Sequence, residues 1–420
     1  MGDRVKFLLK RLGEKLWVRP LAMSVLSMAT VFLAKAVDTL KIGRLVPAVT
    51  PDSIEVLLTI ISASMLVIAT FAVASMVSAY ASASNTATPR SFSLVISDDV
   101  SQNALSTFIG AFIFSIVALM ALKNSYYDKA GRFALFALTL MILAMVIITF
   151  VRWVDCIARL GRLGGTIEKV EAVTAAALQR RRCAPTLRGV PAGPFRKARQ
   201  AVYGGSIGYV QRVDVSVLQA FAKRSRVRIR VEALPGSFSA PGRALAYVNA
   251  DPGEDLDIDT SQIAQAFLIG GDRKFDEDPR YGLVVLSQIA SRALSPAVND
   301  SGTAIDIIGT FVRLFALWSE PVEEGDRLSC EFDRVEVPEI SLRDMFDDAF
   351  TAIARDGAGS IEVAGRLQKA FHALAMTGDA AMQEVAMHHA SLALARAENA
   401  LELREDLEVV RELAKFTDWA

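Results

Sequence analysis

The chain has few of the residues that build metal clusters and disulfide frameworks. Its 420 residues include 3 cysteines and 3 histidines. Cys156, Cys183 and Cys330 lie too far apart in sequence for a zinc cluster or a paired framework. Net charge is also absent, because 46 Lys and Arg balance 46 Asp and Glu. The composition excludes a disordered chain, a collagen and a disulfide scaffold, and nothing in it requires an oxidising compartment.

Signatures of common catalytic sites are scarce as well. The sequence has no Walker A phrase and no H-E-x-x-H phrase. His388 and His389 are adjacent, so on a helix they point to different faces and chelate poorly. We expect these two and His372 to be surface residues. The sequence therefore predicts no enzyme, no metal site and no cofactor.

What the sequence does have is apolar residues and charged residues in separate places. A mean hydropathy of +0.34 stands beside 22% charged residues. Residues 251–420 hold 15 Lys and Arg against 33 Asp and Glu, which leaves 31 and 13 for the first 250 residues. The two parts thus carry +18 and −18. This division predicts a basic part that meets an anionic surface, and an acidic part that stays in water or meets a basic partner.

Four apolar segments approach the roughly 20 residues that a membrane-spanning helix needs. The first is the weakest, since only Leu21 to Ala34 is uncharged, and a buried soluble helix is its alternative. Basic residues concentrate before the first segment and after the fourth, so the positive-inside rule predicts two cytoplasmic termini. We expect a multi-pass protein of the bacterial inner membrane with spans at about 17–37, 56–80, 104–122 and 133–151.

The predicted fold class is a membrane α-helical bundle of four transmembrane helices followed by a cytoplasmic α+β domain. Its regions are a transmembrane domain (1–154), a basic juxtamembrane linker (155–200), a small β module (201–250) and a mainly helical acidic domain (251–420). Within the last, we expect a short helix over 261–268 and a long helix over about 380–415. The β module resembles half of a biotinyl-type barrel, but no lysine lies between Lys223 and Lys274 to carry a cofactor.

Polar residues recur at two places in the predicted bundle. Four on the second span share one helix face, which can line a watery path or let another helix pack closely. Four more stand at the start of the third span, where they can cap the helix or, if several subunits meet, attract cations. The candidate pathway-lining residues are Ser75, Ser78, Ser82, Asn85, Asp98, Asp99, Gln102 and Asn103.

Two further clusters follow the bundle. A basic one lies next to the membrane and is expected to contact anionic lipid headgroups, at about 1 kcal/mol per residue. Few aromatics accompany it, so no nucleic-acid binding is predicted. It comprises Arg180, Arg181, Arg182, Arg196 and Lys197. The second cluster would converge where two helices meet at a proline, to bind a ligand or to cap those helices. It comprises Asp278, Arg292, Ser295, Asn299 and Asp300.

Several phrases resemble the domain-of-unknown-function family 2254, a family of predicted bacterial membrane proteins. They include Thr88-Pro-Arg-Ser-Phe92, Asp278-Pro-Arg-Tyr-Gly-Leu283 and Arg292-Ala-Leu-Ser-Pro-Ala-Val-Asn-Asp300. Where the family usually continues Asn-Asp-Pro, this sequence has Ser301. The resemblance implies the membrane topology and supplies no activity.

Two functions remain open on the sequence. The first is a homo-oligomeric channel or transport protein with a cytoplasmic regulatory domain, in which the second and third spans line a path for ions. The second is a membrane-anchored sensor or scaffold that recruits a cytoplasmic partner to its acidic surface. Small-residue faces in the spans and the Ala- and Leu-rich terminal helix predict the homo-oligomer.

Overall fold

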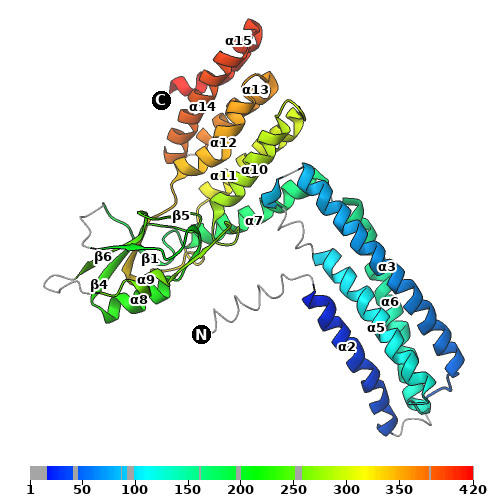
Figure 1. Cartoon of the computed structure of the whole chain (residues 1–420). Coiled ribbons are helices and arrows are strands. Elements are labelled where there is room, and N and C mark those ends of the chain that lie inside the picture. Colours follow the sequence, from blue (N-terminus) through cyan, green and yellow to red (C-terminus); the bar gives the residue numbers. More distant parts are fainter. Residues whose placement is uncertain are drawn as a thin grey trace. The chain divides into compact units, whose positions relative to one another are not determined.

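The computed structural model divides into two units, residues 1–166 and 167–420, and each is described by itself (Figure 1). The structure describes residues 17–40, 46–86, 88–91, 99–159, 162–194, 200–250, 258–377 and 380–419. Three predicted site residues lie outside these ranges, namely Asp98, Arg196 and Lys197.

Unit 1 consists of long apolar helices. They are α2 (Val18–Ala36), α3 (Pro51–Thr86), α5 (Asp99–Lys123) and α6 (Lys129–Arg159), with short turns η1 (Val37–Leu40) and η3 (Pro89–Ser91). Each predicted span overlaps one of these helices. With 36 residues, α3 is about 54 Å long at 1.5 Å per residue, so it is longer than a hydrocarbon core of about 30 Å.

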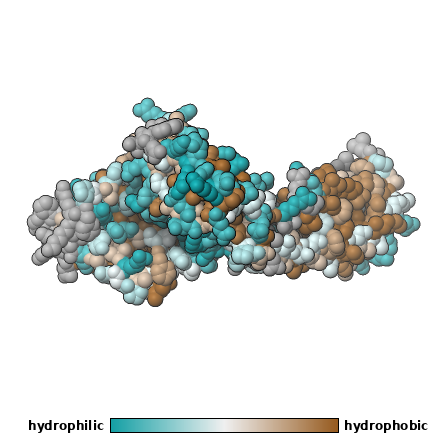
Figure 2. All heavy atoms as spheres, turned by 90° about the horizontal axis from the view of Figure 1, so that it is seen from above, coloured by the Kyte–Doolittle hydropathy of each residue, from teal (hydrophilic) through white to brown (hydrophobic). Residues whose placement is uncertain are grey.

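The centre of unit 1 is α5, which packs against α2, α3 and α6. Half of its apolar window is buried, against less than a third for the other three helices. The outside of the unit carries large apolar side chains, such as Leu33, Val67 and Met141, each at least 60% exposed. Figure 2 shows hydrophobic residues spread over these helices. Such a surface on helices of this length is suited to lipid.

Two local features fix the order of the helices in unit 1. Gly110 lets α5 approach α2, since a Cβ there would lie 3.2 Å from the Ser27 hydroxyl and 3.3 Å from Met23. Asp38, just after α2, accepts the backbone N–H groups of Asp128 at 3.0 Å and Gly131 at 2.5 Å. These groups belong to the start of α6, where a helix lacks internal partners for its N–H groups. Asp38 therefore joins the end of α2 to α6.

Unit 2 contains two β sheets that share one core. The larger sheet has the order β1-β8-β4-β6-β2, with β8 parallel to both β1 and β4 and the remaining pairs antiparallel. The smaller, antiparallel sheet has the order β5-β3-β7. The strands are β1 (Gly189–Pro191), β2 (Gln200–Tyr203), β3 (Gly208–Val213), β4 (Val227–Val231), β5 (Phe238–Ser239), β6 (Ala244–Ala250), β7 (Phe267–Gly270) and β8 (Phe332–Val337).

The β module thus extends beyond the predicted range of 201–250. β1, β7 and β8 come from outside it, and helix α8 (Val215–Arg224) lies within it. The predicted helix over 261–268 is wrong in its second half: α9 (Ser261–Ala264) ends early, and Phe267 pairs with Val213 in the smaller sheet. Tertiary pairing decided the structure of these short segments, because their own propensities are weak.

The rest of unit 2 is a two-layer stack of helices, preceded by α7 (Leu163–Cys183), which crosses the unit boundary. One layer is α10 (Pro279–Ala293), α12 (Leu342–Asp356) and α14 (Ala380–Ala400); the other is α11 (Ser301–Ser319), α13 (Ile361–Ala375) and α15 (Arg404–Ala414). Each helix packs against the one two places further along the chain, and Figure 1 shows the pairs following one another. A final turn, η4 (Lys415–Trp419), ends the chain. This is the architecture of a helical repeat stack.

Two of these helices differ from expectation. The long helix predicted over 380–415 is two helices, because Leu403 is extended and lets α15 fold back onto α13. In addition, α11 is a fifth helix that is long and apolar enough to cross a membrane. Its apolar face is covered by the stack, since Ile307, Phe311 and Phe315 are fully buried. Five helices of the described chain are therefore long and apolar enough to span a membrane, and the four of unit 1 differ from α11 in exposing large apolar side chains.

Candidate functional site

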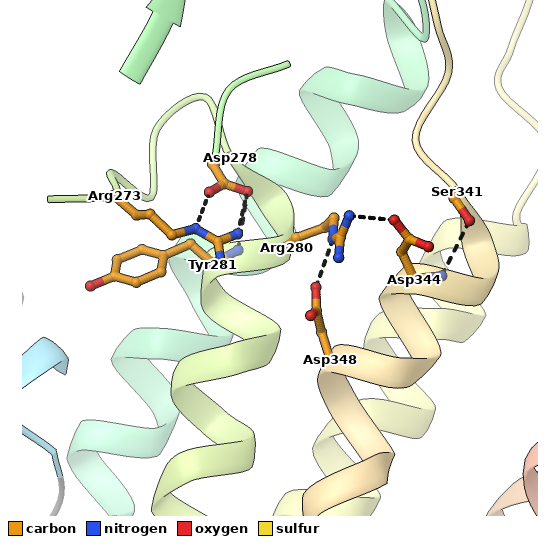
Figure 3. Close-up of polar contacts among 7 residues, drawn as sticks. All are labelled: Arg273, Asp278, Arg280, Tyr281, Ser341, Asp344 and Asp348. Atoms are coloured by element: carbon orange, nitrogen blue, oxygen red, sulfur yellow. Dashed lines mark hydrogen bonds and ion pairs between the residues drawn. The ribbon is translucent and has the colours of Figure 1, made fainter. Parts of the chain in front are cut away.

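A connected polar site in the described part of unit 2 surrounds Asp278, at the start of α10 (Figure 3). Asp278 caps this helix by accepting the backbone N–H of Tyr281 at 3.2 Å, and Pro279 occupies the first helical position. Asp and Pro are favoured at these two places, because the cap satisfies a free N–H and proline needs none. The local sequence therefore fixes where the carboxylate stands.

Asp278 is 2% exposed, and both of its oxygens are held by one arginine. Arg273 donates from Nε at 2.7 Å and from Nη2 at 3.1 Å, and its guanidinium lies 5.2 Å from the centre of the Tyr281 ring. Burial raises the pKa of the Asp278 carboxyl, which these hydrogen bonds only partly offset. The turn at Gly236, with φ +95°, lies directly against the carboxylate and has no room for a Cβ.

A second arginine, Arg280, connects α10 to α12. It donates from Nε to Asp348 at 2.6 Å and from Nη1 to Asp344 at 2.7 Å. Figure 3 shows Arg280 turned toward these two carboxylates and away from Asp278. Ser341 caps α12 by accepting the N–H of Asp344 at 3.2 Å, which fixes the helix turn that meets Arg280.

On the other side, the site is closed by α7. Arg181 is 4% exposed and donates to the carbonyl of Glu277 at 3.3 Å. Burial lowers the pKa of this guanidinium. Gly282 packs so tightly on Thr174 that a side chain there would overlap it, and Arg313 of α11 holds Glu171 of α7 at 2.6 Å.

The predicted headgroup cluster is therefore wrong for Arg181, whose side chain is covered by protein. Arg180 is exposed but donates to the carbonyl of Asp276 at 2.6 Å, and Arg182 donates to the carbonyl of Glu320. The guanidinium groups of Arg180 and Arg182 are therefore directed at unit 2, where the loop before α10 and the end of α11 provide the accepting carbonyls. Within the predicted linker (155–200), residues 163–183 form the helix α7 and residues 189–191 form strand β1.

The predicted convergence of five polar residues at the proline break is also not found. Asp278 begins α10 and Arg292 ends it, which separates them by roughly 20 Å along a 15-residue helix. The other members serve as caps: Ser295 donates to the carbonyl of Arg292, and Asp300 accepts the N–H of Thr303 at 3.0 Å. Asn299 has φ 50°, a left-handed conformation that asparagine tolerates. Of the two predicted roles of this cluster, ligand binding and helix capping, the hydrogen bonds match helix capping.

The candidate pathway residues do not share one surface. Ser78 and Ser82 are exposed on α3 and Ser75 is half-buried, while Gln102 of α5 is 3% exposed inside the bundle. Asn103 accepts a hydrogen bond from Arg19 of α2 at 3.1 Å. Asp99 begins α5, and its side chain, like that of Asn85, lies outside the described atoms. Because α5 is enclosed by three helices, its buried residues cannot face the same space as Ser78.

Two further features bear on chemistry, and the sequence interpretation misjudged the first. His389 is 2% exposed, between the rings of Phe346 and Phe371, so it is not a surface residue. Gly204-Gly-Ser-Ile-Gly208 has the G-x-S-x-G spacing of a hydrolase nucleophile elbow. It joins β2 to β3, however, whereas an elbow joins a strand to a helix. The phrase is a loop between strands.

The hydrogen bonds and ion pairs of the Asp278 site link structural elements of unit 2 to one another. The carboxylates and guanidinium groups of the site bind one another, and Asp278 also accepts the backbone N–H of Tyr281. Arg181 of α7 donates to the carbonyl of the neighbouring Glu277. No group of three or more His, Cys, Asp or Glu in the described part of the chain is placed to hold a metal ion. The site joins the sheets to the helical stack.

A family model of predicted membrane proteins, DUF2254, matches residues 13–373. The chain belongs to this family. The match covers both units, so the DUF2254 sequence pattern includes the bundle, the sheets and most of the helical stack. The structure gives a role to the residues of the Asp278-Pro-Arg-Tyr-Gly-Leu283 phrase. Asp278 caps α10, Pro279 is the first residue of that helix, and Arg280 binds α12. The Tyr281 ring lies against Arg273, and Gly282 packs closely on α7.

Curated relatives are similar over a smaller part. The uncharacterized protein MT1328 of Mycobacterium tuberculosis (strain CDC 1551 / Oshkosh) is 34% identical over 107 residues, which are 24% of this chain and 20% of that protein. The uncharacterized protein Mb1321c of Mycobacterium bovis is 33% identical over the same length. The chain thus matches about a fifth of the length of these relatives. No solved structure matches it.

Proposed function

We propose that this DUF2254 protein is a membrane-anchored scaffold, in which unit 1 holds the helical stack of unit 2 at the inner membrane to recruit a protein partner. The observation that carries the proposal is the two-layer stack α10–α15. Such stacks present extended surfaces that bind other proteins. The assignment rests on architecture, so the partner is a matter for experiment.

The charge distribution supports a basic partner on the cytoplasmic side. Residues 251–420 carry 33 acidic and 15 basic residues. Basic residues near the first and fourth apolar helices favour cytoplasmic termini and therefore a cytoplasmic unit 2. Attraction between the acidic stack and a basic partner would weaken with salt, because exposed charges are screened.

Site-specific photo-crosslinking tests the scaffold in cells. A benzoyl-phenylalanine residue would replace Leu392 on α14 or Val409 on α15, both exposed, and Val67 on the outer face of α3 would serve as the control position. We expect a discrete adduct from the stack positions and none of that size from α3. Adducts from α3 alone, consisting of two copies of the chain, would contradict the scaffold and favour the second function.

A second function, a channel or transport path between subunits of a homo-oligomer, is favoured by one observation. Ser78 and Ser82 are exposed on α3, beside exposed apolar side chains such as Val77. In a monomer these hydroxyls would face lipid or the membrane boundary, and in an oligomer they would meet another helix or water. The enclosed position of α5 restricts any such path to the space between copies.

Ion flux in proteoliposomes tests this second function. Ser78→Leu should reduce flux several-fold, while Val77→Leu, at the neighbouring exposed position, should leave it unchanged. A monomeric mass in detergent, or a folded oligomer without flux, would exclude the path.

A further inference from the structure

One face of unit 2 is apolar and aromatic without belonging to the stack. It is the outer side of the smaller sheet together with the loop that enters it and with Tyr203 at the end of β2. Its exposed fractions are 52% at Tyr203, 67% at Ile207, 41% at Phe238 and 41% at Leu268. With Tyr209, whose ring lies 5.2 Å from that of Phe238, these residues are called the apolar sheet face.

The residues of this face are neighbours in the sheet. Tyr209 of β3 pairs with Phe238 of β5, and Leu268 of β7 pairs with Arg212 of β3. The alternating positions Val210 and Phe267 point into the core and are buried. Strand alternation therefore places Tyr209, Phe238 and Leu268 on the opposite, outer side.

The loop that presents Ile207 is fixed to the sheet. The Ser239 hydroxyl donates to the carbonyl of Ser206 at 3.1 Å. Gly208 lies so close to the carbonyl of Gly270 that a Cβ would overlap it. A rigid loop holding an exposed isoleucine loses little conformational entropy when that side chain is buried by a partner.

We propose that the apolar sheet face inserts into the surface of the bilayer that anchors the chain. Tyrosine and phenylalanine beside aliphatic side chains are the composition of membrane interfaces. Arg212 within the face and the exposed Arg243 directly before β6 supply charge for anionic headgroups.

Chain connectivity selects the bilayer as the occupant. α6, a helix apolar enough to span a membrane, ends at Arg159, and α7 begins at Leu163. The tether between α6 and the sheets of unit 2 is therefore a few residues plus the 21-residue helix α7. A tether this short gives the face a high effective concentration at the bilayer, so a weakly binding surface is occupied. The inference rests on membrane anchoring and not on the scaffold function.

Fluorescence quenching in nanodiscs tests the proposal on the full chain. Cys156, Cys183 and Cys330 are replaced by serine, and an environment-sensitive dye is attached to Ile207→Cys or, as a matched exposed aliphatic control, to Val409→Cys. The discs contain phosphatidylcholine and phosphatidylglycerol with a nitroxide-labelled lipid. We expect quenching at position 207 to exceed that at 409 at least about twofold, because interfacial side chains lie about 5–10 Å into the boundary.

A second pair of variants separates the bilayer from other occupants. Adding Leu268→Asp to the Ile207→Cys protein should reduce the quenching to the level of the 409 control, with an unchanged circular dichroism spectrum. Equal quenching at 207 and 409 would overturn the proposal. So would a dye at 207 that is shielded from both nitroxide lipid and aqueous iodide, because it would then be covered by protein. Neither result bears on crosslinking from the helical stack.

Discussion

The bundle of unit 1 carries exposed phenylalanine side chains on its outside, whereas the helical stack of unit 2 buries its phenylalanines. Phe32 and Phe71 are 60% and 62% exposed in the bundle, whereas Phe311, Phe350 and Phe371 are fully buried in the stack. Inside the bundle, α5 buries Phe108 and Phe114 together with small polar residues, such as Ser101, Ser106 and Ser115. The solvent decides the arrangement: lipid accepts apolar surface, so the bundle is held by close packing and hydrogen bonds.

The largest expected effect comes from removing a ring from the stack. Phe350 on α12 contacts Phe311, Phe315 and Phe371 at ring separations of 4.8 to 5.6 Å. Phe350→Ala should lower the free energy of unfolding of unit 2 by about 3–5 kcal/mol, measured by hydrogen exchange of α12 amides. Phe32→Ala on α2 is the matched control, with an expected change within about 0.5 kcal/mol. A large effect at Phe32 would mean that protein covers the outside of the bundle.

The next effect concerns the buried ion pair between Arg273 and Asp278 at the start of the stack. Asp278→Ala leaves Arg273 without its carboxylate and α10 without its cap, so a loss of about 3–5 kcal/mol is expected in urea unfolding. Asp300→Ala, which removes only a cap, should cost about 1 kcal/mol. Adding Arg273→Met to Asp278→Ala should recover part of the loss. If Asp278→Ala costs no more than Asp300→Ala, the pair does not connect the sheets to the stack.

A pH effect is expected from the buried histidine of the stack. Burial lowers the pKa of His389 to about 4, from an ordinary value near 6.5 that applies when the chain is unfolded. Between these values only the unfolded state binds the proton, so the stack should lose stability as pH falls from 6.5 toward 4, by up to roughly 3 kcal/mol. His389→Leu should flatten this dependence relative to the parent. His388→Leu, at an exposed position, should retain it.

The smallest effect belongs to the bundle. Gly110→Leu would push α2 away from α5 and should cost about 1–3 kcal/mol in detergent unfolding. Met120→Leu, at a position of α5 that is 63% exposed, should have no effect. Equal stability of the two variants would show that α2 does not depend on the Gly110 contact.

Features set by local chemistry were predictable from the sequence. Asp300 caps α11 and a helix ends before Pro296, because caps and proline act within a few residues. The apolar segments coincide with long helices, because a bilayer needs about 20 apolar residues in a row. The membrane location followed from these segments.

Features set by distant contacts were not predictable. Arg181 was expected at lipid headgroups, and only the approach of α10 to α7 shows it to be buried. His389 is covered by α12 and α13, which its own neighbours in sequence do not reveal. The candidate pathway residues were grouped by helical period alone, and the enclosure of α5 by three helices separates Gln102 from Ser78. Helical periodicity shows which residues share one face of a helix, but it does not show which other elements pack against that face.

The parallel strand β8 has a consequence for how the protein is made. It lies between β1 and β4, yet it leaves the ribosome about a hundred residues after β4, so the larger sheet closes late in synthesis. Until Val337 has emerged, the β4 edge that β8 later fills has unpaired backbone groups and is open to pairing with other chains. Chains that terminate within α10 or α11 should therefore aggregate at the membrane surface, whereas chains that end after β8 have a closed sheet.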